Sequence, residues 1–220
     1  MPKWFKTILA VLLLPACVGL AGSLGRVLRS SSTADTVWVA LGAGAAAWGV
    51  IYWLLPKPMW VYVFGHELTH ALWTWLFGGE VHQFKVTARG GHVVVSKNNF
   101  LISLAPYFFP LYAVGVVLVY LVGDWRWDWS AYLAVFHVLL GAAYAFHVTL
   151  TAYVLQSRQS DITQHGWFFS AVIIFLGNGA GLLLAIPLLA GRTAVAEAFI
   201  WWWRDTLAIL TALARLAHLN

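Results

Sequence analysis

Two histidines four positions apart, with a glutamate directly after the first, form the motif His66-Glu67-Leu68-Thr69-His70. On a helix, residues i and i+4 share a face, so both imidazoles can bind one metal ion while the Glu67 carboxylate reaches a water that the metal activates. Zinc in such a setting lowers the pKa of water toward about 7, and Glu67 can take the proton and pass it to a leaving amine. The motif predicts hydrolytic zinc chemistry, with Glu67 as general base and acid.

The setting of the motif supports this interpretation. A shuffled chain of the same composition would contain the motif with a probability of only about 0.4%, so coincidence is a poor explanation. The surrounding segment, 59–77, is apolar and long enough to cross a bilayer, and Glu67 is its only formally charged residue. Ionisable groups are costly in hydrocarbon and mark functional sites there. We therefore expect a metal site within a membrane.

The third protein ligand is not settled by the residues alone. A hydrolytic zinc site uses three protein ligands and one water, and five residues are candidates for the third: Asp161, His147, His137, His92 and Glu197. Asp161 precedes an apolar segment, where it could be a ligand, a helix cap or both. His147 could be a ligand, a transition-state donor or a packing residue. Glu197 shares a helical stripe with Arg204 and Arg215, which is typical of a solvated face. The other histidines are expected at the membrane interface: His82, His165 and His218.

The composition is that of a polytopic membrane protein. Of the 220 residues, 61% are hydrophobic and 10% are charged, whereas a soluble domain has about 25% charged residues. Six apolar segments of spanning length recur, at 5–24, 37–55, 59–77, 100–122, 131–155 and 166–190. No linker divides the chain. We predict an all-α polytopic fold with about six transmembrane helices in a single domain over residues 1–220, with its core at about 58–175.

Several local features refine this fold. Residues 80–97 are polar and β-branched around Gly90-Gly91, which predicts an interfacial β-hairpin. Pro106 and Pro110 should kink the fourth span. Small residues between Gly42 and Gly49 should permit close helix packing. The tail, 194–217, contains three consecutive tryptophans and is predicted to form an amphipathic helix at the membrane interface.

Charge and cysteine content exclude other classes. The net charge is +5, but Lys and Arg are scattered, which favours contact with anionic lipid over nucleic acid. Cys17 is the only cysteine, so a disulfide within the chain and a multi-cysteine zinc site are excluded. The segment ending Leu14-Pro15-Ala16-Cys17 loosely resembles a lipoprotein cleavage site, but the apolar run continues beyond it, which favours a retained first span. The distribution of Lys and Arg leaves the membrane orientation open.

Taken together, the pattern resembles the site-2 protease family of intramembrane metalloproteases, the M50 peptidases. The resemblance covers roughly residues 58–175. It is carried by the segment from Gly65 to Ala71, then Gly78-Gly79, the hairpin with Gly90-Gly91, Ala105-Pro106 and a later aspartate before an apolar span. It implies zinc held by His66, His70 and Asp161, with Glu67 as the base. Asp161 matches by its order along the chain, and the family's usual Asp-Gly context is absent.

The resemblance also implies a substrate, and the absence of an organelle signal beyond a possible first span favours a bacterial location. We expect a zinc metalloendopeptidase that cleaves a membrane-embedded or juxtamembrane protein segment, in a bacterial inner membrane surrounded by lipid. An edge of the hairpin, 81–88 or 92–96, could pair with the unwound substrate or could only plug the cavity. Asn98 or Asn99 could clamp the substrate backbone or cap a helix. A metal transporter or sensor and a catalytically silent membrane scaffold remain the alternatives.

Overall fold

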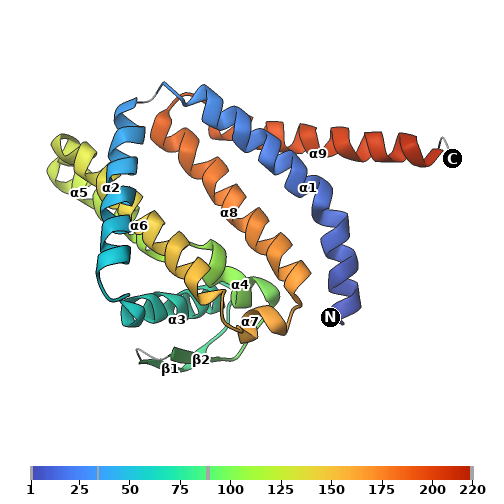
Figure 1. Cartoon of the computed structure of the whole chain (residues 1–220), viewed down its shortest axis with the longest axis horizontal. Helices are drawn as coiled ribbons and strands as arrows, with labels where there is room; N and C mark the ends of the chain where they lie inside the picture. Colours follow the sequence, from blue (N-terminus) through green and yellow to red (C-terminus); the bar gives the residue numbers. More distant parts are fainter. Residues whose placement is uncertain (1, 34, 88–89, 219–220) are drawn as a thin grey trace. The chain divides into compact units, whose positions relative to one another are not determined.

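A computed structural model describes residues 2–33, 35–87 and 90–218 (Figure 1). Its elements are α1 (Lys3–Ser30), α2 (Asp35–Leu54), α3 (Met59–Leu76), β1 (Val81–Thr87), β2 (Gly90–Val95), α4 (Phe100–Phe108), α5 (Leu111–Trp127), the 3-10 helix η1 (Trp129–Tyr132), α6 (Leu133–Val154), α7 (Ser160–Thr163), α8 (Trp167–Ala190) and α9 (Val195–His218). The chain forms two compact units, one over residues 35–161 and one joining the N-terminal segment to the residues from 162 onward. The single membrane domain remains a prediction.

In the unit of residues 35–161, α2 and α6 pack closely along each other because glycines line their contact. A Cβ on Gly44 would lie 1.8 Å from the carbonyl oxygen of Val138, and one on Gly141 would lie 2.1 Å from the carbonyl oxygen of Leu41. Only hydrogen fits between backbones this close. The predicted role of the small residues between Gly42 and Gly49 is thus confirmed at Gly44.

α3 is held by packing on one side and by the hairpin on another. A buried apolar cluster joins α2, α3 and α6 and consists of Trp48, Tyr62, Val63, Phe146 and Leu150. The helix begins directly after Pro58, in keeping with the predicted break at the two prolines before it. These tertiary contacts therefore fix the position of α3, and the face that carries His66 and His70 lines a cavity.

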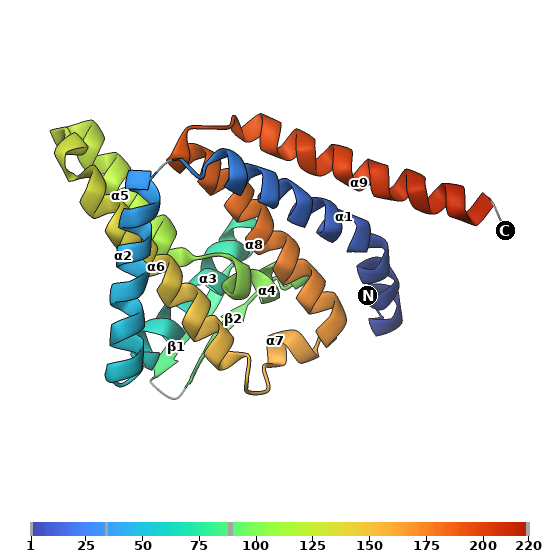
Figure 2. The same ribbon diagram turned by 45° about the horizontal axis from the view of Figure 1, so that its top comes forward.

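The predicted hairpin is present within residues 80–97. β1 and β2 are antiparallel, with Val81 opposite Val95 and Thr87 opposite Gly90, and the register shifts between Val81 and Gln83. Most of their residues are exposed, and both strands lie against α3 (Figures 1 and 2). The hairpin therefore gains its support from the helix that carries the motif.

The number of membrane spans differs from the six that were predicted. Four helical segments in the described part of the chain are long and apolar enough to cross a membrane: Lys3–Ser30, Thr36–Leu54, Trp129–Val154 and Trp167–Ala190. A fifth is possible if α4 and α5, which are bent by 72°, count as one span. α3 is not among them, since its histidines and Glu67 lower its hydropathy. The chain is a multi-pass membrane protein with four or five such candidates.

The break between α4 and α5 lies at Pro110. Pro106 is inside α4, whereas Phe109 is extended and Pro110 directly precedes α5. Because proline disfavours helix at the residue before it, Phe109 ends the first helix and the chain turns. The predicted kinked span is thus two helices with a sharp bend.

In the second unit, α9 packs along α1 through its first half (Figures 1 and 2). The Ser23 hydroxyl donates to the carbonyl of Ala198 at 2.8 Å, the indole of Trp202 donates to that of Ala16 at 2.8 Å, and Arg26 pairs with Asp205. Beyond these contacts, residues 207–217 are mostly exposed. The predicted helix of 194–217 is present, and its place at the membrane interface remains a prediction.

Candidate metal centre

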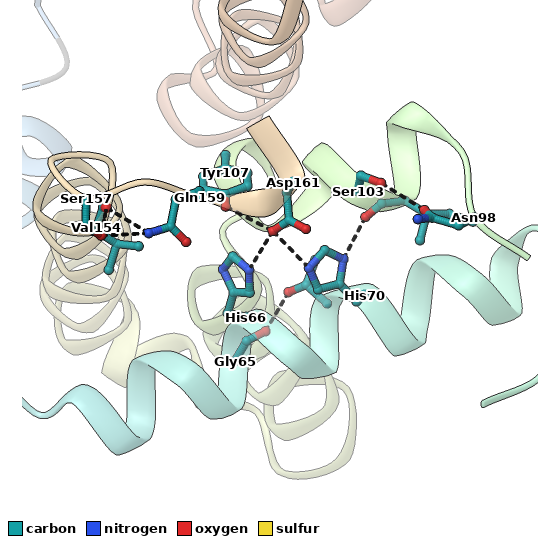
Figure 3. Close-up of polar contacts among 12 residues, drawn as sticks. Gly65, His66, His70, Asn98, Ser103, Tyr107, Val154, Ser157, Gln159 and Asp161 are labelled. Atoms are coloured by element: carbon teal, nitrogen blue, oxygen red, sulfur yellow. Dashed lines mark hydrogen bonds and ion pairs between the residues drawn. The ribbon is translucent and has the colours of Figure 1, made fainter. Parts of the chain in front are cut away.

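The face of α3 presents two imidazoles to one carboxylate. The rings of His66 and His70 have centroids 4.9 Å apart, and both point toward Asp161 on α7 (Figure 3). The Asp161 Oδ2 atom lies 3.4 Å from His66 Nε2 and 3.5 Å from His70 Nε2. One ligand atom from each residue lies within 4.8 Å of the others. Among the described residues, this is the one group of three histidine, cysteine or acidic side chains so arranged.

These separations suit a zinc ion. Zinc prefers tetrahedral coordination by nitrogen and oxygen at about 2.0–2.2 Å, and the ligand atoms of such a tetrahedron are about 3.4 Å apart. The two Nε2–Oδ2 distances, 3.4 and 3.5 Å, match that edge length. The donor set of two imidazole nitrogens and one carboxylate oxygen also matches that of catalytic zinc sites. The residues present therefore fit a zinc ion.

The Asp161 carboxylate is held in its charged form. Burial alone would raise its pKa, but the hydrogen bonds with His66 and His70 outweigh burial and hold the pKa of Asp161 below its ordinary value. A charged oxygen is what a divalent cation requires. Asp161 lies in the first turn of α7, and the N-cap residue of α8 is Gly166, so Asp161 does not cap the following span, which was one of the two roles that the sequence allowed.

Tyr107 is a site residue that the sequence did not predict. Its hydroxyl donates to Asp161 Oδ2 at 3.0 Å, and its side chain on α4 is only 1% exposed. The contact joins residues 54 positions apart, so no local spacing signals it. Tyr107 thus fixes the orientation of the carboxylate through the same oxygen that faces the two histidines.

The two histidines differ in what lies behind them. His70 Nδ1 donates to the carbonyl of Ile102 at 2.9 Å, which turns its Nε2 toward Asp161. His66 Nδ1 is buried, and none of the described residues accepts a hydrogen bond from it. The orientation of His70 is therefore fixed by α4, and that of His66 needs another explanation.

Glu67 lies against the hairpin and lines the main cavity. It is 8% exposed, and a Cβ on Gly91 would lie 2.9 Å from its Oε1. The cavity has a volume of about 430 Å³ and is lined by His66, Glu67, His70 and Asp161, together with residues of β2 and Asn98. This volume is in the range of small-molecule sites. The carboxylate of Glu67 therefore shares one cavity with the three candidate ligands.

The two asparagines at the start of α4 have different positions. Asn99 caps the helix, since its Oδ1 accepts from the Ile102 amide at 2.9 Å. Asn98 accepts from the Ser103 hydroxyl at 2.8 Å and lines the main cavity. Of the two, Asn98 is the one placed to meet a ligand.

The remaining candidates lie elsewhere. His92 lines the main cavity from β2, His147 and His137 are buried in α6, and Glu197 is exposed on α9. None of these joins the three-residue group among the described side chains. Of the histidines predicted at the interface, His82 is exposed, His165 contacts Lys6 Nζ at 2.6 Å, and the side chain of His218 lies outside the described residues.

The fold and the site together define a multi-pass membrane protein with a cavity that contains two histidines, a glutamate and an aspartate. The family described as Peptidase M50B-like matches residues 36–157, which is more than half of the chain, and the chain belongs to this family. The predicted membership of the M50 peptidases is thereby confirmed. The matched segment includes His66, Glu67, His70 and Tyr107 and ends before Asp161. No curated protein and no solved structure matches the chain.

Proposed function

We propose that this chain is an intramembrane zinc endopeptidase that hydrolyses peptide bonds in membrane-embedded or juxtamembrane segments of other proteins. The observation that carries the proposal is the position of Asp161 Oδ2, at 3.4 and 3.5 Å from the Nε2 atoms of the two motif histidines. Membership of a peptidase family supports it. The bacterial inner membrane is our prediction for its location.

In this proposal, His66, His70 and Asp161 are the zinc ligands. A zinc ion there would supply Lewis-acid activation of water and of the scissile carbonyl. The chain's own contribution is to hold the ligands in place before the ion binds. Tyr107 and the Ile102 carbonyl do this for Asp161 and His70, and such supporting hydrogen bonds preserve the orientation of ligands.

Glu67 is proposed as the general base and acid. It is adjacent to His66 in the chain and lines the same cavity as the three ligands. Its carboxylate takes a proton from the attacking water as the new C–O bond forms, and delivers that proton to the amide nitrogen as the C–N bond breaks. Because Glu67 is largely shielded by the hairpin, little bulk water competes for this proton.

The substrate is proposed to bind in an extended form. A helix in a membrane bonds its own amides, so it must unwind before a peptide bond can be attacked. The cavity is bordered by Gly90, Gly91, His92, Val93 and Val95 of β2, and a strand can bind an unwound segment through main-chain hydrogen bonds. Asn98 offers a further amide at the same cavity. These features support a protein segment as the substrate.

The test uses purified protein in lipid vesicles with a library of single-span peptides. Wild-type protein should bind one zinc ion and yield new peptide termini detected by mass spectrometry. The Glu67→Gln variant should retain zinc and yield no products, because an amide cannot accept the proton. Zinc binding by the wild type without any cleavage would overturn the proposal in favour of a silent scaffold or metal sensor, as would cleavage by the Glu67→Gln variant.

A further inference from the structure

The ring of His66 has a buried nitrogen that faces away from Asp161. A histidine that binds metal through Nε2 carries its proton on Nδ1 and almost always donates it to a carboxylate, a carbonyl or a water. His70 meets this rule through Ile102, but His66 Nδ1 finds no acceptor among the residues described. Leaving a buried donor without a partner is energetically costly. An acceptor for His66 is therefore required.

A second, small cavity is also lined by His66. It has a volume of about 20 Å³ and is lined by His66, Tyr62, Gly65, Thr69, Tyr112 and His147, with apolar residues around them. One water needs roughly 10–15 Å³ of such space and two to four polar partners. The cavity therefore fits one water, and its lining is polar enough to hold it.

His147 is one lining group that can be the second partner. The hydroxyl protons of Thr69 and Tyr112 already go to the carbonyls of Gly65 and Val61, so these two hydroxyls can only accept from a water. His147 is 7% exposed on α6, and no hydrogen bond joins it to another residue in the described part of the chain. A neutral imidazole has one nitrogen that accepts. A water can thus accept from His66 Nδ1 and donate to His147.

We propose that a single buried water bridges His66 Nδ1 and His147, so that His147 is a positioning residue for the proposed ligand His66. The proposal rests on the proposed zinc site. It assigns to His147 a role outside the ligand set and gives His66 the support that Ile102 gives His70. It also explains why a histidine lies buried behind the motif helix in an otherwise apolar stretch of α6.

The test measures zinc affinity by competition with a chelator, without any assay of activity. His147→Phe keeps a ring of similar size but cannot accept a hydrogen bond, so the zinc dissociation constant should rise about 10- to 100-fold. His147→Gln keeps an acceptor and should restore most of the affinity. His137→Phe changes the other buried histidine of α6, which does not line the cavity, and should leave the affinity unchanged. His147→Leu repeats the test if the phenylalanine variant does not fold.

The outcomes separate this proposal from the zinc site itself. A wild-type protein that binds no zinc would overturn the proposed function. Tight zinc binding by the wild type with equal affinity in His147→Phe or His147→Leu would overturn only the water bridge. Equal losses in His147→Phe and His137→Phe, or in His147→Phe and His147→Gln, would also overturn it, because they would show an effect of packing rather than of the hydrogen bond.

Discussion

Gly91 of β2 lies directly against Glu67 of α3. A Cβ at position 91 would lie 2.7 Å from the Glu67 Cγ and 2.8 Å from the carbonyl oxygen of Lys85. The neighbouring Gly90 is needed for a different reason, since its φ of +147° is a conformation that other residues rarely adopt. The two adjacent glycines therefore serve separate purposes: Gly90 adopts an unusual backbone conformation at the start of β2, and Gly91 leaves space beside the proposed base.

Gly91→Ala should impair catalysis without removing the metal. The added methyl must displace either the hairpin or Glu67, and a shift of about 1 Å in a catalytic group can reduce the rate about 100-fold. The zinc content should stay at the wild-type value, because none of the proposed ligands is touched. Gly115→Ala is the control, since a Cβ there meets nothing within 4 Å. Cleavage by Gly91→Ala at the wild-type rate would contradict the close contact with Glu67.

Asp161→Ala should weaken zinc binding more than about 100-fold, which exceeds the effect of losing a supporting residue. The carboxylate contributes one of three proposed ligand atoms and the only negative charge among them. Asp124→Ala changes an exposed aspartate of α5 and should bind zinc as the wild type does. Undiminished zinc in the Asp161→Ala protein, measured by elemental analysis, would move the third-ligand role to another residue.

Tyr107→Phe should weaken zinc binding by about tenfold while the protein stays folded. The ring continues to fill its buried site, and the hydrogen bond to Asp161 is lost. The matched control is Tyr120→Phe, whose ring stacks on Phe136 away from the centre. A lower melting temperature with unchanged zinc affinity would show that Tyr107 acts on stability alone.

Gly141→Val should destabilise the packing of α2 on α6. The position faces the Leu41 carbonyl so closely that the helices must separate, and overpacking typically costs about 1–3 kcal/mol. Gly42→Val is the comparison, because a Cβ at Gly42 meets nothing within 4 Å. Denaturation in detergent micelles should distinguish the two variants. Equal midpoints would mean that the close approach of the helices is not maintained in solution.

The site was predictable where its geometry is local. His66 and His70 share a face because any helix places positions i and i+4 together, and Glu67 follows from the same repeat. The hairpin at 80–97 follows from its composition, but Gly90 and Gly91, which were predicted to lie between the strands, are the first two residues of β2. For Asp161, order along the chain alone suggested a role, and tertiary structure brings it to His66 across 95 positions.

Other parts of the site depend on tertiary contacts that leave no pattern in the sequence. Tyr107 and the Ile102 carbonyl are supplied by α4. This helix contains Pro106 and ends at Phe109, directly before Pro110, and the sequence alone did not show which of the two prolines would end it. The six predicted spans exceed the four or five candidate spans of the structure because α3 combines spanning length with a polar motif. The length of α3 and the absence of charged residues other than Glu67 favoured a membrane span, but the mean hydropathy of α3 is too low for one.

The dependence of the hairpin on α3 has a consequence for motion. A two-stranded sheet is at best marginally stable alone in water, and most residues of β1 and β2 are exposed. Its amides should therefore exchange with solvent deuterium sooner than those in the middle of α3, through local opening at low free-energy cost. Because Gly91 lies against Glu67, such an opening would also uncover that side of the carboxylate.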